Sequence, residues 1–266
     1  MRIAMSEEFT QKISDAELVL VGIGEELEIG RKTMEKNDLY ARAFEQAGED
    51  QKRFPYIEKH FFDRSGDEAV LSRKSDYSRL AGLLEGKNYF VVTLCTDGLI
   101  HGTGFDEGRI VEPCGNMEKM QCADKCTPEI YDRKEEVRKL GEMLLSGREP
   151  DDFTVPSCPL CGKELVFNNI SAENYAEEGY LKRWASYTKW LQGTVNRRVC
   201  MVELGVGMRF PTVIRWPFEK IVYFNQKAFL FRIHSRLYQT AQEIKERSRG
   251  IEASVPDFLK ALSNEA

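Results

Sequence analysis

The hydrophobic pattern of the chain shows short apolar runs that stop at glycine or at small polar residues. The first run covers Ala16 to Val21 and ends at Gly22-Ile23-Gly24, and the second covers Tyr89 to Thr93 and ends near Asp97-Gly98. Continuous β-branched and aromatic runs of this length are typical of strands that are buried on both faces, as in parallel sheets. Both runs therefore predict core strands whose carboxyl ends carry turns.

Three further runs have the same character and predict strands at Gly108 to Glu112, Val199 to Leu204 and Lys220 to Asn225. Charged segments with helical spacing predict helices at Glu129 to Ser146, Asn174 to Trp190, Gln239 to Arg247 and Val255 to Leu262. We interpret the aromatic residues of the polar stretch from Arg31 to Phe62 as packing helices onto a core. This alternation of strands and helices predicts an α/β fold with a Rossmann-like parallel sheet and helices on both faces.

Composition narrows the class of protein. The chain has 266 residues, 42% hydrophobic residues and a net charge of −5, which suits one large domain with a smaller insertion and argues against a nucleic-acid partner. No apolar run approaches the ~18 residues of a membrane span, so no membrane contact is expected. Seven cysteines, an odd number, and an opening without a signal-peptide pattern indicate a cytoplasmic protein with reduced thiols.

Four of the cysteines form two closely spaced pairs. Cys122 and Cys126 are separated by three residues, and Cys158 and Cys161 by two. Short spacers of this kind let two turns supply four thiolates to one tetrahedral Zn²⁺ ion. A site with four cysteine ligands is coordinatively closed, so we expect a structural zinc and look for chemistry elsewhere.

Glycines follow two of the predicted strands, at Gly22 and Gly24 and again at Gly205 and Gly207. Backbone N–H groups at such turns can donate to phosphate oxygens, although an ordinary tight turn has the same pattern. Asp97 is either a turn-forming residue before Gly98 or a ligand-binding carboxylate at a strand end.

In chain order, these segments resemble the sirtuin family of NAD-dependent protein-modifying enzymes. The matching stretches are Gly22-Ile23-Gly24, Thr93 to Leu99, Cys114-Gly115, the four paired cysteines, Gly205-Val206-Gly207 and Phe224-Asn225. The resemblance spans Leu18 to Phe231. It implies NAD as the cofactor, a structural zinc and a protein substrate.

Within that family the chain is more similar to the macrodomain-linked bacterial branch, whose members are protein mono-ADP-ribosyltransferases. Val21 to Gly24, Glu203 to Gly207 and Pro217-Phe218 match that branch, as does the spacing of the first cysteine pair. The resemblance implies that the glycines bind phosphate, that Asn225 binds a ribose hydroxyl, and that Asp97 holds the nicotinamide amide or positions ribose.

The departures from the family pattern fall on the reaction centre. Cys114 stands where sirtuins have the catalytic histidine, and Cys95 stands where they have the asparagine of the nicotinamide pocket. Glu25-Glu26 replaces the serine of the phosphate loop, and two carboxylates beside a pyrophosphate would repel it. His101 could substitute as the base or be an ordinary polar residue.

The two cysteines also suggest a hypothesis of their own. If Cys95 and Cys114 faced each other across the nicotinamide pocket, a thiolate could act as a base or trap the ribosyl centre. The alternative is that both are inert buried cysteines, as we expect for Cys200.

Two function classes follow. The first is a protein mono-ADP-ribosyltransferase that cleaves the nicotinamide–ribose bond of NAD, with deacylation as a less favoured alternative. The second is a catalytically inactive nucleotide-binding or partner-binding protein that zinc stabilises. For either, residues 1–114 and 171–266 are expected to form the Rossmann-like domain and residues 115–170 the zinc module, with the ligand cleft between them.

Overall fold

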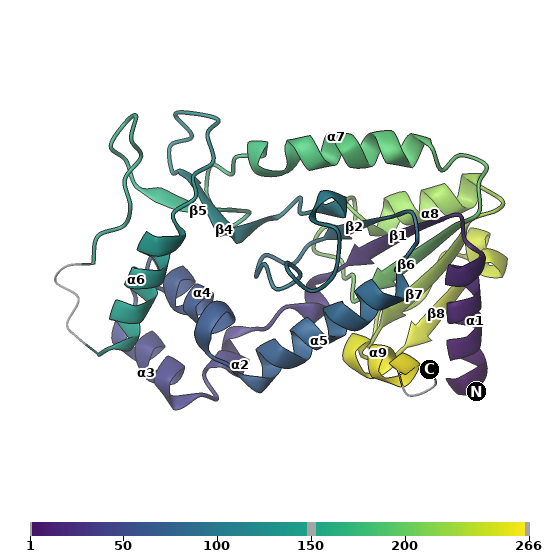
Figure 1. The fold of residues 1–266 in the computed structure, drawn as a ribbon, viewed down its shortest axis with the longest axis horizontal. Helices are drawn as coiled ribbons and strands as arrows, with labels where there is room; N and C mark the ends of the chain where they lie inside the picture. Colours follow the sequence, from purple (N-terminus) through teal and green to yellow (C-terminus); the bar gives the residue numbers. More distant parts are fainter. Residues whose placement is uncertain (1, 148–152, 264–266) are drawn as a thin grey trace.

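The computed structural model describes residues 2–147 and 153–263. A sheet flanked by helices forms one end of the molecule, and a smaller lobe with the antiparallel strands β4 (Gly115–Cys122) and β5 (Leu165–Asn169) forms the other (Figure 1). The fold class predicted from the sequence is confirmed: the protein is α/β, with a Rossmann-like sheet and a separate two-stranded sheet next to a group of four cysteines.

The main sheet has six strands in the order β3-β2-β1-β6-β7-β8, and all its pairings are parallel. Its strands are β1 (Leu18–Ile23), β2 (Tyr89–Thr93), β3 (Ile110–Val111), β6 (Val199–Leu204), β7 (Phe229–His234) and β8 (Ser248–Glu252). Ile23 pairs with both Thr93 and Leu204, and Leu204 pairs with Ile233. The carboxyl ends of the four central strands therefore meet at one edge.

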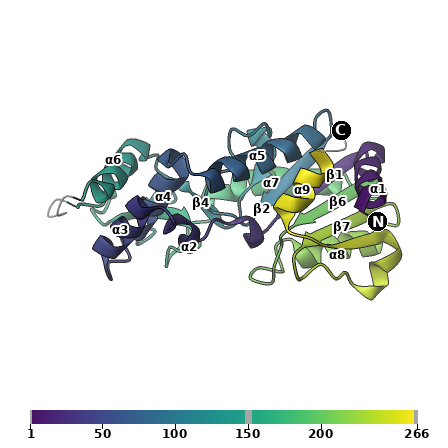
Figure 2. The ribbon, with the colours of Figure 1, turned by 90° about the horizontal axis from the view of Figure 1, so that it is seen from below.

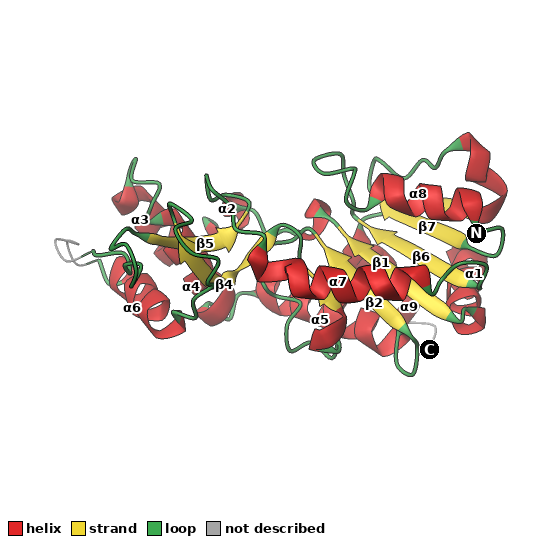
Figure 3. Ribbon diagram, turned by 90° about the horizontal axis from the view of Figure 1, so that it is seen from above, coloured by secondary structure: helices red, strands yellow, loops and turns green. Residues whose placement is uncertain are grey.

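Both faces of the sheet are covered by helices, as a fully buried parallel sheet requires. The helices α1 (Arg2–Asp15), α5 (Glu68–Leu83) and α9 (Val255–Ser263) bury apolar side chains on one face (Figure 2). The helices α7 (Glu178–Gln192) and α8 (Arg215–Phe224) cover the other face (Figure 3). The helices predicted for residues 174–190 and 255–262 are thus confirmed as α7 and α9.

The predicted strand from Lys220 to Asn225 is wrong, because these residues belong to α8 and its end. Phe218 and Val222, four residues apart, are buried on one helical face, whereas Tyr223 and Phe224 are 51% and 70% exposed. Pro217 lies in the first turn of α8, where a proline is tolerated. The strand next to β6 is β7, which begins five residues after α8.

Two other expectations need smaller corrections. The strand predicted for Gly108 to Glu112 is reduced to the two residues of β3, because the 3₁₀ turn η2 (Glu107–Arg109) takes up its first half. The helix predicted for Gln239 to Arg247 is the 3₁₀ segment η3 (Gln242–Arg247). Within residues 2–147 and 153–263, none of the helices combines the length and the apolar character of a membrane-spanning segment.

The smaller lobe joins segments from distant parts of the sequence. The antiparallel strands β4 (Gly115–Cys122) and β5 (Leu165–Asn169) lie beside α6 (Lys134–Leu145), which confirms the helix predicted for residues 129–146. The helices α2 (Arg31–Met34), α3 (Asp38–Ala47) and α4 (Phe54–Arg64) also belong to this part of the molecule. The aromatic residues of this stretch that are buried, as interpreted from the sequence, are Tyr40, Phe44, Tyr56, Phe61 and Phe62.

A glycine contact explains how closely α4 and α6 approach. A Cβ atom on Gly141 of α6 would lie 2.9 Å from the Cβ atom of His60 and 3.1 Å from the carbonyl oxygen of Tyr56. Helix α4 therefore packs against a helix from residues 115–170, although the predicted division places the two in different domains. The boundaries at residues 114 and 171 stay a prediction.

Candidate functional site

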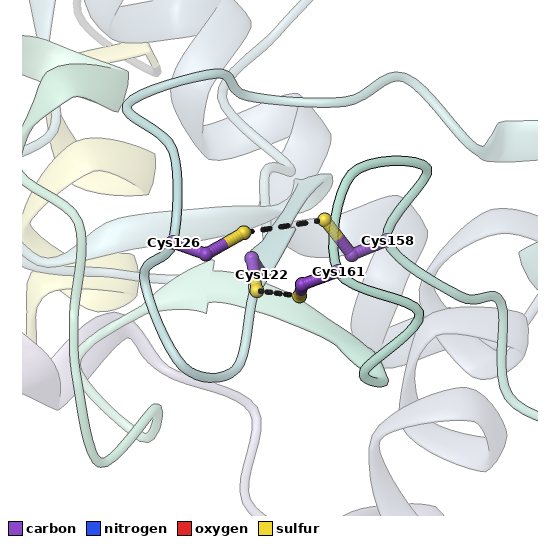
Figure 4. A group of neighbouring side chains, drawn as sticks. All are labelled: Cys122, Cys126, Cys158 and Cys161. Carbon is purple, nitrogen blue, oxygen red and sulfur yellow. Dashed lines mark hydrogen bonds between the residues drawn. The ribbon is translucent and has the colours of Figure 1, made fainter.

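The four paired cysteines converge on one point (Figure 4). Their sulfur atoms all lie within 4.8 Å of one another. The Cys122–Cys161 and Cys126–Cys158 sulfur pairs are 3.5 Å and 3.6 Å apart. A tetrahedral ion with Zn–S bonds of ~2.3 Å needs sulfur atoms separated by about 3.8 Å, so the group fits zinc.

The cluster joins two turns of the smaller lobe. Cys122 ends β4 and Cys158 precedes β5, and both are buried, whereas Cys126 and Cys161 are exposed. The N–H of Gly162 donates to the Cys158 carbonyl over 2.9 Å, which closes the second turn. All four ligand positions come from protein, so the ion would be structural, as predicted.

A second group of candidate residues lies at the carboxyl edge of the main sheet, where β1, β2, β6 and β7 end. The loop after β1 packs directly on the loop after β6. A Cβ atom on Gly24 would lie 2.3 Å from the Cα atom of Val206 and 2.4 Å from the carbonyl oxygen of Gly205. Glycine at position 24 is therefore required by the contact between the two loops.

Gly22 has a different reason to be glycine. It lies within β1, and a Cβ atom there would meet the side chains of Ile214 and Phe218 at 2.4 Å and 3.1 Å. The residue lets α8 approach the sheet. Gly205 has a φ of +65°, which a residue with a side chain adopts only with strain.

Several backbone N–H groups at this edge bond to protein carbonyls. Gly24 donates to Leu204 over 2.9 Å, and Gly205 donates to Ile233 over 2.8 Å. These bonds extend the parallel ladder, and they tie the loop after β1 to the end of β6 and the loop after β6 to the end of β7. The predicted phosphate-binding role of Gly22, Gly24, Gly205 and Gly207 stays a prediction.

Asp97 lies just beyond β2 at the same edge. Its Oδ1 atom accepts the N–H of Leu99 over 2.9 Å, which forms the turn at Gly98. Its Oδ2 atom is buried and has no hydrogen-bond partner among the described residues. Burial raises the pKa of this carboxyl to about 6, although the bond from Leu99 opposes the rise. The turn-forming role is thus confirmed, and one oxygen atom is left free for a ligand.

Two residues of α5, Arg73 and Tyr77, interact electrostatically with Asp97, and the sequence pattern did not single them out. The Tyr77 hydroxyl is buried beside Cys95. Neither this hydroxyl nor the buried Nε atom of Arg73 has a hydrogen-bond partner in the described part of the chain. The charge of Arg73 lowers the pKa of Asp97. The signal in the sequence was spacing: Arg73 and Tyr77 lie four residues apart, on the same helical face as buried Leu80.

Cys95 and Cys114 are both buried, but they do not form the predicted pair. Cys95 packs among residues on the α5 side of the sheet, and Cys114 packs on the α8 side. The Cys95 Sγ atom lies 3.4 Å from the carbonyl oxygen of Gly24. Burial raises the pKa of Cys95 well above its ordinary value and that of Cys114 to about 12. Both thiols are neutral near pH 7, which contradicts the thiolate hypothesis. Cys200 is buried in β6, as expected.

His101 lies between two carboxylates. Its Nδ1 atom is 2.6 Å from Glu107, and its Nε2 atom is 3.2 Å from Glu112. Burial alone would lower the pKa of this imidazole, but the hydrogen bonds and charges of Glu112 and Glu107 outweigh burial and raise the pKa to about 9. A histidine that is charged at pH 7 donates protons, so this geometry does not favour His101 as a base.

The charge on His101 predicts a pH-dependent stability. Because the pKa rises from 6.5 in the unfolded chain to about 9 in the folded protein, the stabilisation is complete below pH 6.5 and is lost as pH rises through 9. We expect about 1–3 kcal/mol less stability at pH 10 than at pH 6.5 from this group, and no such loss in His101→Gln. Urea unfolding of the wild type and of His101→Gln between pH 6 and pH 10 measures this loss of stability. If the stability of both proteins changed with pH in the same way, the stabilising charge on His101 would be contradicted.

The structure places Asn225 away from this edge, which corrects the prediction that it binds ribose there. Its side-chain amide donates to the carbonyls of Thr194 and Arg197, which precede β6. It therefore lies near the amino ends of the strands. The residue that ends β7 at the site edge is His234, whose Nδ1 atom accepts the N–H groups of Arg236 and Leu237 at 3.0 Å and 3.2 Å. The apolar run that precedes His234 was the signal in the sequence.

Comparisons with solved structures agree on the fold. A Sir2 enzyme described for its mechanism and regulation aligns over 98% of this chain and 97% of its own, with a TM-score of 0.58 and 15% identity. A Sir2 complex with a p53 peptide and NAD aligns over 97% of each chain, with a TM-score of 0.55 and 16% identity. The fold is therefore that of the Sir2 enzymes, which confirms the predicted resemblance at the level of structure.

Two curated proteins are similar in sequence. A protein ADP-ribosyltransferase of Staphylococcus aureus is 23% identical over 193 residues, which cover 71% of this chain and 61% of that protein. A probable bifunctional ADP-ribose hydrolase/ADP-ribosyltransferase of Fusarium oxysporum f. sp. cubense is 26% identical over 147 residues, 52% of this chain and 24% of that protein. The matches thus span less than two thirds of either relative. No protein-family model matches the chain.

Proposed function

We propose that the protein is an NAD-dependent protein mono-ADP-ribosyltransferase that cleaves the nicotinamide–ribose bond. The observation that carries the proposal is the Oδ2 atom of Asp97, which has no hydrogen-bond partner in the described part of the chain and is buried at the carboxyl edge of a Sir2-type sheet. Ligands of open α/β sheets bind at this edge. Both similar curated proteins are named as ADP-ribosyltransferases, which supports an enzyme over the inactive alternative.

The nicotinamide end of NAD suits the residues around Asp97. A carboxylate oxygen without a partner can accept the N–H of a carboxamide, and the Tyr77 hydroxyl and Arg73 Nε offer polar contacts nearby. The cost of leaving these groups unpaired in the free protein is regained when a ligand pairs them. NAD would supply ADP-ribose: the bond from ribose C1′ to nicotinamide breaks with its electrons going to nicotinamide, and a protein side chain bonds to C1′ and gives up its proton.

Residues of this chain favour the transfer of ADP-ribose to protein over deacylation. Cys114 occupies the position of the histidine base in the sirtuin pattern, and a buried thiol with a pKa of about 12 does not accept a proton near pH 7. We also propose a cytoplasmic location, because the four zinc-site cysteines need a reducing compartment. Residues 1–114 with 171–266, and residues 115–170, remain our proposed domains.

Asp97→Asn tests the proposal. The amide keeps an oxygen for the N–H of Leu99 but loses the charge, so we expect nicotinamide release from NAD to fall about 10- to 100-fold while folding is kept. Asp132→Asn is the matched control, because exposed Asp132 accepts the N–H of Lys134 in a turn of the same kind. Chromatography of the released nicotinamide compares both variants with the wild type. Equal release by Asp97→Asn and the wild type would refute the role of Asp97.

A further inference from the structure

The backbone N–H groups of the loop after β6 are already bonded to an anion that belongs to the protein. The Oε2 atom of Glu25 accepts the N–H of Gly207 over 3.3 Å, and its Oε1 atom accepts the N–H of Arg209 over 3.2 Å. A Cβ atom on Gly207 would lie 2.6 Å from Oε1, so the carboxylate sits directly on this glycine. One carboxylate from the β1 loop thus bridges two N–H groups of the β6 loop.

Glu26 also accepts a backbone N–H group, just after the end of β7. Its two carboxylate oxygens accept the N–H of Ser235 at 3.1 Å and 3.3 Å, and its Cβ atom lies where a side chain on Gly205 would be, 2.7 Å away. His234 offers Glu26 no proton, because its Nδ1 atom, 3.6 Å from Glu26, accepts two N–H groups of its own. The carboxylate therefore depends on the backbone donor.

These donors are the kind that dinucleotide-binding folds direct at pyrophosphate, at loops that follow parallel strands. A carboxylate and a phosphate both present anionic oxygens to such N–H groups. The phosphate end of NAD therefore does not fit the site while Glu25 and Glu26 keep these bonds, in contrast to the nicotinamide end.

The shape of the loops does not depend on the two glutamates alone. Arg215 is buried and donates to the carbonyls of Val206 and Leu237, which ties the β6 loop to the segment after β7. Gly205 and Gly24 also bond to neighbouring strands through their N–H groups. Glu25 can therefore leave its donors while the loops stay assembled.

We propose that Glu25, with Glu26 beside it, is an internal anion that occupies the phosphate-binding N–H groups, so that a pyrophosphate-containing ligand binds only by displacing it. This role presupposes the nucleotide site proposed above. It makes Glu25 a specificity-determining residue: ligands with a pyrophosphate compete with a tethered carboxylate, and two anions cannot share the same donors without strong repulsion. We therefore expect the wild type to bind ADP-ribose more weakly than an enzyme of this fold in which no carboxylate occupies these N–H groups.

Calorimetric titration with ADP-ribose tests the role of Glu25, because this probe carries the pyrophosphate but no nicotinamide. Glu25→Ala should bind ADP-ribose at least about tenfold more tightly than the wild type, and Glu25→Gln, which keeps the side-chain volume, should also bind more tightly. Glu28→Gln is the matched control, since it removes a carboxylate three residues away. Burial raises the pKa of Glu28 to about 7, so the titrations are made at pH 8, where it is ionised.

Each outcome decides between the two proposals. Tighter binding by both Glu25 variants but not by Glu28→Gln supports the internal anion. Binding by the wild type with no gain in the Glu25 variants would overturn it and leave the nucleotide site standing, as would an equal gain in Glu28→Gln, which would indicate general charge repulsion. If neither the wild type nor Glu25→Gln bound millimolar ADP-ribose, the nucleotide site itself would be refuted.

Discussion

Cys158→Ser should yield a protein that holds no zinc and loses its cooperative unfolding transition or much of its stability. Cys158 is a buried member of the four-cysteine group, and three remaining thiolates bind zinc far more weakly than four. Structural zinc contributes about 10 kcal/mol or more to the folding of small metal domains, so a loss of at least about 4 kcal/mol in unfolding free energy is expected here. Metal analysis and thermal unfolding measure the two effects.

Leu160→Ser is the matched control for this substitution. Leu160 lies in the same turn as Cys158 and Cys161, but its side chain is 67% exposed and offers no metal ligand. We expect one zinc ion per chain and nearly unchanged stability. Wild-type protein that contains no zinc after expression in zinc-supplemented medium, or Cys158→Ser as stable as Leu160→Ser, would contradict a structural metal.

Gly24→Ala should disrupt the carboxyl edge of the sheet. The added methyl group would lie 2.3 Å from the Cα atom of Val206, and its neighbours there are backbone atoms that cannot rotate away. The loops after β1 and β6 would be forced apart. We expect about 1–3 kcal/mol of destabilisation and loss of any thermal shift with NAD.

The same substitution at Gly30 separates this steric effect from the general effect of replacing glycine. A Cβ atom at Gly30 meets nothing within 4 Å, and its φ of −77° suits any residue. Gly30→Ala should therefore keep both the stability and the response to NAD. A Gly24→Ala protein that behaves like Gly30→Ala would show that the loop contact is not needed.

The parallel strands β1, β2 and β6 could be predicted because each is a largely apolar run followed by glycine or small polar residues. Residues 220–225 have a similar composition, but only the structure shows that Phe218 and Val222 share a buried helical face. Side-chain periodicity over six residues does not separate a buried strand from the end of a helix. The error moved Asn225 to the wrong edge of the sheet and left β7, the strand that His234 ends, without a prediction.

The zinc ligands could be predicted because metal spacing is local in the sequence. The electrostatics at the carboxyl edge of the main sheet could not be predicted. Glu25 and Glu26 were expected to repel a pyrophosphate, but nothing in the sequence showed that their carboxylates bond to Gly207, Arg209 and Ser235. Nor did it show that Cys95 and Cys114 lie on opposite faces of the sheet. Both depend on how loops far apart in the chain pack together.

We propose above that this edge of the sheet cleaves NAD and transfers its ADP-ribose to protein. Incubation of the chain with NAD labelled in the adenine ring, in the presence of a protein extract, tests it when released nicotinamide and protein-bound label are measured together. Released nicotinamide and protein-bound label should increase in a ratio near one to one, and both should fall in Asp97→Asn. Nicotinamide release without label on protein, or no release at millimolar NAD, would contradict it.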